Sequence, residues 1–129
     1  MRAKCFFSIL ALTSVIAFTS PALAQGDAAN GEKVFNKCKA CHTVEEGKNK
    51  VGPTLYNVIG RKAGSLEDFR YSSAMKEYGA AGTVWDEETL NAYLEAPKEV
   101  VEGTKMAFVG LKKPEDRDDV IAYLKQFSE

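Results

Sequence analysis

The stretch Cys38-Lys39-Ala40-Cys41-His42 carries the most specific chemistry in this 129-residue sequence. Two thiols three residues apart lie on neighbouring ridges of one helical turn, and a histidine follows directly. This spacing suits the two vinyl groups of a haem, to which the thiols can add as thioethers, and it carries the imidazole under the iron. The pattern Cys-x-x-Cys-His therefore predicts covalent attachment of a c-type haem through Cys38 and Cys41.

Three other uses of these residues agree less well with the sequence. A zinc site needs a fourth protein ligand or an open catalytic position, and the chain has three cysteines and one histidine in all. A thioredoxin-like redox pair should follow a strand in a βαβ pattern, but no strand pattern precedes Cys38. A plain disulfide between Cys38 and Cys41 would leave His42 without a role. Haem attachment is the interpretation that uses all three side chains.

Residues 1–24 have the pattern of a cleaved signal peptide. Arg2 and Lys4 give a positive start, a short apolar run follows, and a small-x-small cleavage site ends at Ala24. The apolar run is shorter than the roughly twenty residues that cross a bilayer. We therefore expect export to the periplasm, with one domain over residues 25–129.

The charge balance gives no support for nucleic-acid binding. Processing would remove two of the 17 basic residues and none of the 18 acidic ones, so the net charge would fall from −1 to −3. Several lysines nevertheless cluster around the segments that contain Cys38 and Met106. They are Lys37, Lys48, Lys50, Lys98, Lys105, Lys112 and Lys113. We expect this local positive charge to orient redox partners despite the acidic total.

Apolar periodicity predicts an all-α protein. Between residues 43 and 64 glycines interrupt every pattern, and such a long ordered loop is unusual unless it wraps something, for which a haem is a good candidate. No segment has a convincing strand pattern. Helices are expected over 27–38, 71–78 and 86–96 and from Pro114 to the C-terminus, while Pro97 either ends the third of these or begins a short helix to about Val101.

The second axial ligand must be sought among the methionines, because His42 is the only histidine. After processing, Met75 and Met106 remain. Met75 lies on an apolar helical stripe, where methionine usually packs in the core. Met106 lies in a loop between Gly103 and Gly110 and is not part of any predicted helical face. The pattern favours Met106 without excluding Met75, and Met/His ligation suits electron transfer.

Several motifs, taken in order, resemble those of the class I cytochromes c, especially mitochondrial cytochrome c and its short bacterial relatives of the cytochrome c-two type. The resemblance covers essentially all of residues 25–129. It implies a cytochrome c fold in which the N- and C-terminal helices cross, while shorter helices and loops wrap one covalently bound haem. The motifs after the attachment site are Gly52-Pro53, Gly60-Arg61-Lys62, Thr83-Val84-Trp85 and the highly specific Gly103-Thr104-Lys105-Met106-Ala107-Phe108.

The resemblance also implies roles for individual residues. His42 would be the proximal ligand of the iron, with its ring N–H held by the carbonyl of Pro53. Met106 would be the distal ligand, with the Tyr93 hydroxyl near its sulfur, and Phe108 would shield that side. The residues at positions that surround the haem propionates would be Arg61, Tyr71, Trp85 and Thr104.

The function implied by this resemblance is that of a soluble one-electron carrier of a respiratory or photosynthetic chain, not an enzyme. Its donor would be a quinol–cytochrome c oxidoreductase, and its acceptor a terminal oxidase, a reductase or a photosynthetic reaction centre. The carrier would be a monomer that contacts these membrane complexes peripherally. An enzyme or gas sensor with an open sixth site and a redox module from a larger complex are the alternatives. One departure is Met75, which replaces an asparagine that helps to hold a buried water in relatives.

Overall fold

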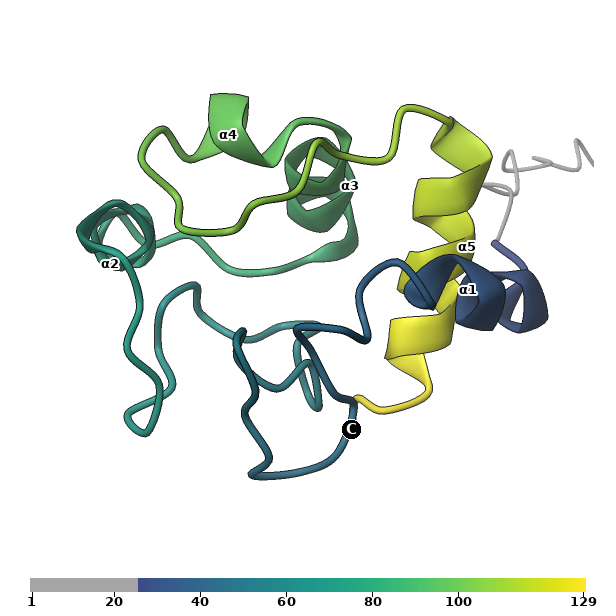
Figure 1. The fold of residues 1–129 in the computed structure, drawn as a ribbon, viewed down its shortest axis with the longest axis horizontal. Coiled ribbons are helices and arrows are strands. Elements are labelled where there is room, and N and C mark those ends of the chain that lie inside the picture. Colours follow the sequence, from purple (N-terminus) through teal and green to yellow (C-terminus); the bar gives the residue numbers. More distant parts are fainter. Residues whose placement is uncertain (1–25) are drawn as a thin grey trace, which may run out of the picture.

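The computed structural model describes residues 26–129, and the predicted signal peptide over 1–24 lies outside this range. The only extended pairing within the described residues is one bridge between Lys62 and Val84, which confirms the all-α prediction. No helix in this range has the length and hydrophobicity that a membrane crossing requires. The helices are α1 (Ala28–Phe35), α2 (Ser73–Ala80), α3 (Glu87–Glu95), α4 (Pro97–Val100) and α5 (Pro114–Lys125) (Figure 1).

Each helix begins where local chemistry favours a start. The carboxylate of Asp27 accepts two backbone N–H groups of the first turn of α1, at 2.8 and 3.1 Å. Asp86 and Ser72 cap α3 and α2 in the same way, with bonds of 2.7 and 3.1 Å. Pro97 and Pro114 occupy first positions of α4 and α5, where a missing N–H costs nothing. The predicted starts at Asp27, Asp86 and Pro114 are confirmed.

Helix α1 ends earlier than the apolar pattern predicted, at Phe35 instead of about Cys38. The chain continues in turns that mix two spacings. The N–H of Cys38 donates three residues back to the Phe35 carbonyl (2.8 Å), whereas that of His42 donates four residues back to the Cys38 carbonyl (2.9 Å). The attachment motif therefore keeps helix-like turns, with both thiols on one turn, although it is not part of a regular helix.

Helices α1 and α5 cross at one end of the molecule (Figure 1). The rings of Phe35 and Tyr123 pack with centroids 5.3 Å apart. Gly31 lies against the backbone of Asp119 and the Cβ of Tyr123, with no room for a side chain of its own. The predicted crossing is confirmed, and the missing side chain at Gly31 allows α1 and α5 to approach closely.

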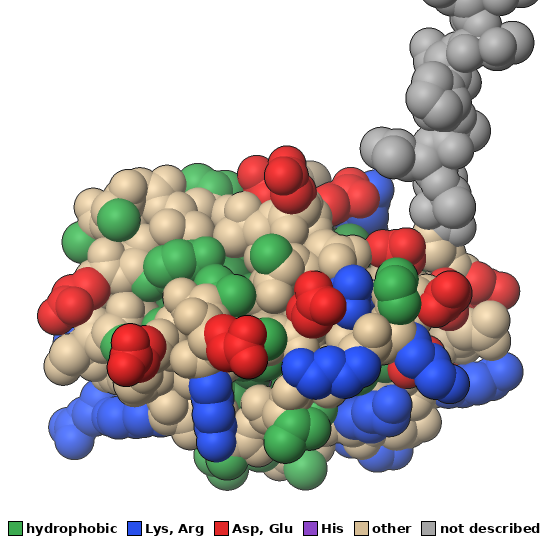
Figure 2. All heavy atoms as spheres, turned by 90° about the horizontal axis from the view of Figure 1, so that it is seen from above, with side chains coloured by type: hydrophobic (Ala, Val, Ile, Leu, Met, Phe, Trp, Pro, Cys, Tyr) green, Lys and Arg blue, Asp and Glu red, His purple; other side chains and the backbone are tan. Residues whose placement is uncertain are grey.

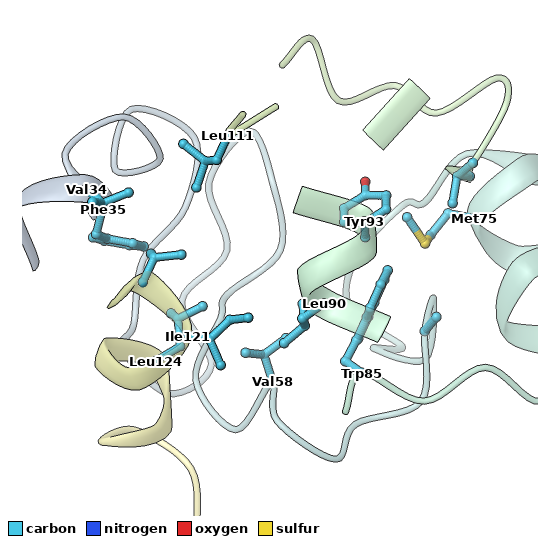
Figure 3. Close-up of a cluster of buried hydrophobic side chains, with 13 residues drawn as sticks. Val34, Phe35, Val58, Met75, Trp85, Leu90, Tyr93, Leu111, Ile121 and Leu124 are labelled. Carbon is cyan, nitrogen blue, oxygen red and sulfur yellow. The ribbon is translucent and has the colours of Figure 1, made fainter. Parts of the chain in front are cut away.

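The core continues from this crossing to α3 and then towards α2 (Figure 3). Helix α3 packs on both α4 and α5. On α3, Leu90 and Tyr93 are buried, and the ring of Tyr93 lies 4.9 Å from that of Trp85. At the far end, Gly79 of α2 fits closely against the Ala63 carbonyl. Loops and helices thus enclose a space between these two ends.

Candidate haem-binding site

A cavity of about 350 Å³ lies between the attachment turn with its following loop on one side and α3 with the 102–113 loop on the other. Apolar side chains such as Leu55, Val58 and Leu94 form much of its wall. All the residues predicted for the site line it, namely Cys38, Cys41, His42, Pro53, Arg61, Tyr71, Trp85, Tyr93, Thr104, Met106 and Phe108.

A second, more open hollow of about 590 Å³ lies beside the attachment turn. Of the predicted site residues, only His42 lines it. Both motif thiols, Arg61 and Met106 line the first cavity and not this one. We therefore place the site in the enclosed cavity.

No disulfide joins the two motif cysteines, of which Cys38 is half-buried and Cys41 exposed. Within residues 26–129, no group of three His, Cys, Asp or Glu side chains is placed to hold a metal ion. The disulfide and zinc interpretations therefore gain no support from the geometry.

The imidazole of His42 is held in one orientation from two sides. Its Nδ1 lies 2.7 Å from the carbonyl oxygen of Pro53, which can only accept a hydrogen bond, so Nδ1 carries the proton. This leaves Nε2 with a lone pair for a metal. Burial lowers the pKa of His42, with smaller contributions from Arg61 and Lys50, and so favours the neutral, ligating form.

Gly52 supports the same ring from its other side, a contact that sequence reasoning did not identify. A Cβ at this position would fall within 2.9 Å of Nε2 and of Nδ1 of His42. Real Cβ atoms do not approach that closely, so only glycine leaves the ring where it is. The available signal was the glycine directly before Pro53, next to the residue that accepts the Nδ1 hydrogen bond.

Both candidate thioether residues, Met75 and Met106, line the cavity. The Tyr93 hydroxyl lies 3.9 Å from the sulfur of Met106, and the N–H of Met106 donates to the Thr104 hydroxyl at 3.3 Å. Burial raises the pKa of Tyr93, which keeps this hydroxyl protonated as a donor. Met75 also lines the cavity, but it extends from α2 towards Tyr93 and is 9 % exposed within the core cluster (Figure 3).

Arg61 provides an unpaired donor in the wall. Its two terminal nitrogens donate to the carbonyls of Tyr56 (3.0 Å) and Thr54 (2.9 Å). Its Nε is the one buried side-chain nitrogen or oxygen between residues 26 and 129 without a hydrogen-bond partner. A buried donor atom without a partner, on a half-buried cation, calls for an anionic acceptor, and haem carries two carboxylates. Two thiols, a free imidazole nitrogen, a thioether, apolar walls and this donor fit a haem.

The sequence model of the cytochrome c family matches residues 28–128. The chain belongs to the cytochrome c family. Cytochrome c2 from Afifella marina is 58% identical over 77% of this chain and 81% of its own length. Cytochrome c2 from Rhodomicrobium vannielii is 54% identical over 86% of this chain and 87% of its own. In fold, cytochrome c2 from Rhodospirillum centenum has a TM-score of 0.77 at 43% identity, covering 81% of this chain and all of that one.

This membership confirms the fold and the main prediction from the attachment motif. The chain is a class I cytochrome c of the c2 type and binds one covalent c-type haem through cysteine. Cytochromes c2 are electron carriers and not enzymes. The structure shows in addition which side chains line the cavity that we assign to the haem.

Proposed function

We propose that this cytochrome c is a soluble periplasmic one-electron carrier whose haem is attached through Cys38 and Cys41 and ligated by His42 and Met106. A bound haem supplies one-electron chemistry at its iron. The observation that carries the proposal is that His42 and Met106, from segments far apart in the chain, both line one largely apolar cavity. A thioether opposite an imidazole raises the reduction potential of a haem and suits electron transfer.

The chain's own residues would keep the site rigid and dry. The Pro53 carbonyl fixes the tautomer of His42, and the Tyr93 hydroxyl and Thr104 hold Met106 from either side. Residues His42 and Met106 would together hold the iron and leave it no free position for a substrate. Phe108 lines the cavity beside Met106 and would help to exclude water.

The polar residues of the wall would hold the carboxylates of the haem. The unpaired Nε of Arg61 is the strongest candidate donor, because it has no partner within the described chain. Burial raises the pKa of Tyr71, so its hydroxyl stays protonated and can also donate. The set would be Arg61, Tyr71, Trp85 and Thr104.

The proposed biological setting follows from the predicted signal peptide and from the cytochrome c2 relatives. Residues 1–24 would direct export and be removed, which leaves a single monomeric domain over 25–129. The donor would be a quinol–cytochrome c oxidoreductase, and the acceptor a terminal oxidase, a reductase or a photosynthetic reaction centre. Contact with these membrane complexes would be peripheral.

Acid–acetone extraction of the purified holoprotein, followed by intact-mass measurement, tests attachment and processing together. We expect the haem to remain on the polypeptide, and the mass to equal residues 25–129 plus one haem, allowing for cyclisation of Gln25. Haem that extracts freely, or two titratable thiols, would overturn the attachment. A mass that retains residues 1–24 would overturn the processing alone.

A further inference from the structure

The loop that carries Met106 has few bonds of its own. Between Lys105 and Gly110, a stretch described throughout, the hydrogen bonds of the structure are the two at Met106. Neighbouring Val109 is 81% exposed. The position of Met106 therefore depends on how the two ends of the loop are held.

The C-terminal end of the loop is tied to the last turn of α3. The N–H of Leu111 donates to the Leu94 carbonyl (2.7 Å), and the Lys112 ammonium donates to the Glu95 carbonyl (2.7 Å). Gly110 passes so close to the Glu95 carbonyl that no side chain fits. This anchor lies only five residues along the chain from Met106.

A buried cation on α5 completes the anchor. Arg117 is 6% exposed, and one terminal nitrogen donates to the carbonyls of Leu111 (2.8 Å) and Lys112 (3.3 Å). Its Nε donates to Oδ1 of Asn91 on α3 (2.8 Å), and its other terminal nitrogen lies 3.8 Å from the carboxylate of Glu95. One guanidinium thus joins α5, α3 and the end of the loop.

We propose that Arg117 is a positioning residue that holds the Met106 loop closed over the haem. The inference rests on the proposed ligation by Met106. Hydrogen bonds from a charged donor are about twice as strong as neutral ones. Without the guanidinium, the Leu111 and Lys112 carbonyls lose their buried donor, so the loop end reorganises and Met106 leaves the iron more often. The charge of Arg117 lies outside the haem cavity, so it acts through the loop and not on the iron.

Cyanide binding to the ferric holoprotein measures this opening, because cyanide reaches the sixth position only when Met106 has left. The apparent affinity is the intrinsic affinity reduced by the open fraction. We expect Arg117→Met to tighten apparent cyanide binding about tenfold or more. Asn91→Ala, which removes the Nε acceptor and also the hydrogen bond from the Asn91 amide to Asp118 (2.8 Å), should act in the same direction with a smaller effect. It keeps the test valid if Arg117→Met folds poorly.

Val120→Ala is the matched control, since Val120 is a fully buried residue of the same helix with no bond to the loop. It should lower the urea midpoint of unfolding but leave cyanide affinity within about twofold. In a Met106→Ala background, Arg117→Met should no longer change cyanide affinity, because no ligand remains to be held.

The outcomes separate the two proposals. If Met106→Ala does not tighten cyanide binding, the ligation proposal fails. If Met106→Ala tightens it while Arg117→Met matches Val120→Ala, Met106 is the ligand but Arg117 is only a structural residue. Equal effects of Arg117→Met with and without Met106 would also overturn the positioning role.

Discussion

At the scale of single residues, the contact between Gly52 and His42 makes the sharpest stability prediction. Gly52→Ala would force a methyl group against the imidazole, so the ring must tilt or the loop must shift. We expect a loss of about 1–3 kcal/mol in the free energy of unfolding and a disturbed ferric spectrum. Urea titration and absorption of the holoprotein measure both effects.

Glu46→Ala is the control for this change, because Glu46 is an exposed residue of the same loop that does not line the cavity. Its effect should stay within about 0.5 kcal/mol, with an unchanged spectrum. If Gly52→Ala behaves like Glu46→Ala, the glycine does not hold the ring.

The sequence predicted the residue types of the site better than it predicted which residues touch one another. Counting alone made His42 the histidine of the site, and loop position favoured Met106 over Met75. Two features could not be predicted from the residues alone, because both depend on how the folded chain packs. They are the unpaired Nε of Arg61 and the close approach of Gly52 to the imidazole of His42. The structure also places both methionine sulfurs at the cavity, so the choice between them stays a prediction.

At the scale of helices, Gly31 reverses the usual rule of helix propensity. Alanine is favoured over glycine inside a helix by about 1 kcal/mol, so propensity alone predicts that Gly31→Ala stabilises α1. The structure predicts the opposite, a loss of about 1–3 kcal/mol, because a Cβ would collide with the Asp119 backbone of α5. Urea titration should show it, while Asn30→Ala on the exposed face should be neutral or slightly stabilising. A more stable Gly31→Ala would mean that the helices can separate at no cost.

The N-cap of α3 should contribute to the pH dependence of stability. The hydrogen bond from the Thr89 N–H lowers the pKa of Asp86 below its ordinary value of 3.8. The unfolded chain therefore binds a proton more readily, and the cap's ionic contribution is present above that value and lost as pH falls below it. Asp86→Asn keeps a capping side chain without a charge, so the stability difference from wild type should shrink on acidification. Glu88→Gln, in the same turn without a cap bond, should show a weaker trend, and equal trends would contradict the assignment.

Caps and prolines made three helix starts predictable, whereas α2 spans Ser73–Ala80 instead of 71–78 and α1 ends early. Asp27, Asp86 and Pro114 mark starts that the structure confirms, because these signals are local. The apolar stripe of α1 runs on to Cys38, but the regular helix ends at Phe35 and tighter turns follow. Apolar spacing indicates which residues point towards the core. It cannot distinguish a helix from successive turns that direct the same residues inwards.

At the scale of the whole molecule, charge is arranged unevenly. Figure 2 shows Lys and Arg side chains gathered mainly along one edge of one face, with Asp and Glu side chains across its middle. In the structure, two lysines of the predicted cluster form ion pairs with acidic side chains. Lys37 pairs with Asp116 (3.5 Å) and Lys48 with Glu45 (3.0 Å). The other lysines of the cluster make no ion pair in the described part of the chain. Among these, Lys105 lines the cavity beside Met106, so its charge should act most strongly on a partner.

Oxidation of the ferrous protein by hexacyanoferrate(III), a small anion, tests this steering. The rate should fall as salt rises, because charge is screened over about 8 Å at physiological ionic strength. Lys105→Glu should slow the reaction at low salt more than Lys37→Glu, and far more than Lys125→Glu on α5. The reduction potential should barely change. Rates indifferent to salt, or equal effects at all three positions, would mean that these lysines only solvate the surface.

The most direct test of the central claim is the ferric absorption spectrum of the holoprotein in the near infrared, where a methionine–iron bond gives a weak band. His42–Met106 ligation predicts this band in wild type and in Met75→Leu. It also predicts loss of the band in Met106→Ala, whose ferrous form should then bind carbon monoxide. A wild-type spectrum without the band, or a band that survives Met106→Ala and disappears in Met75→Leu, would contradict it.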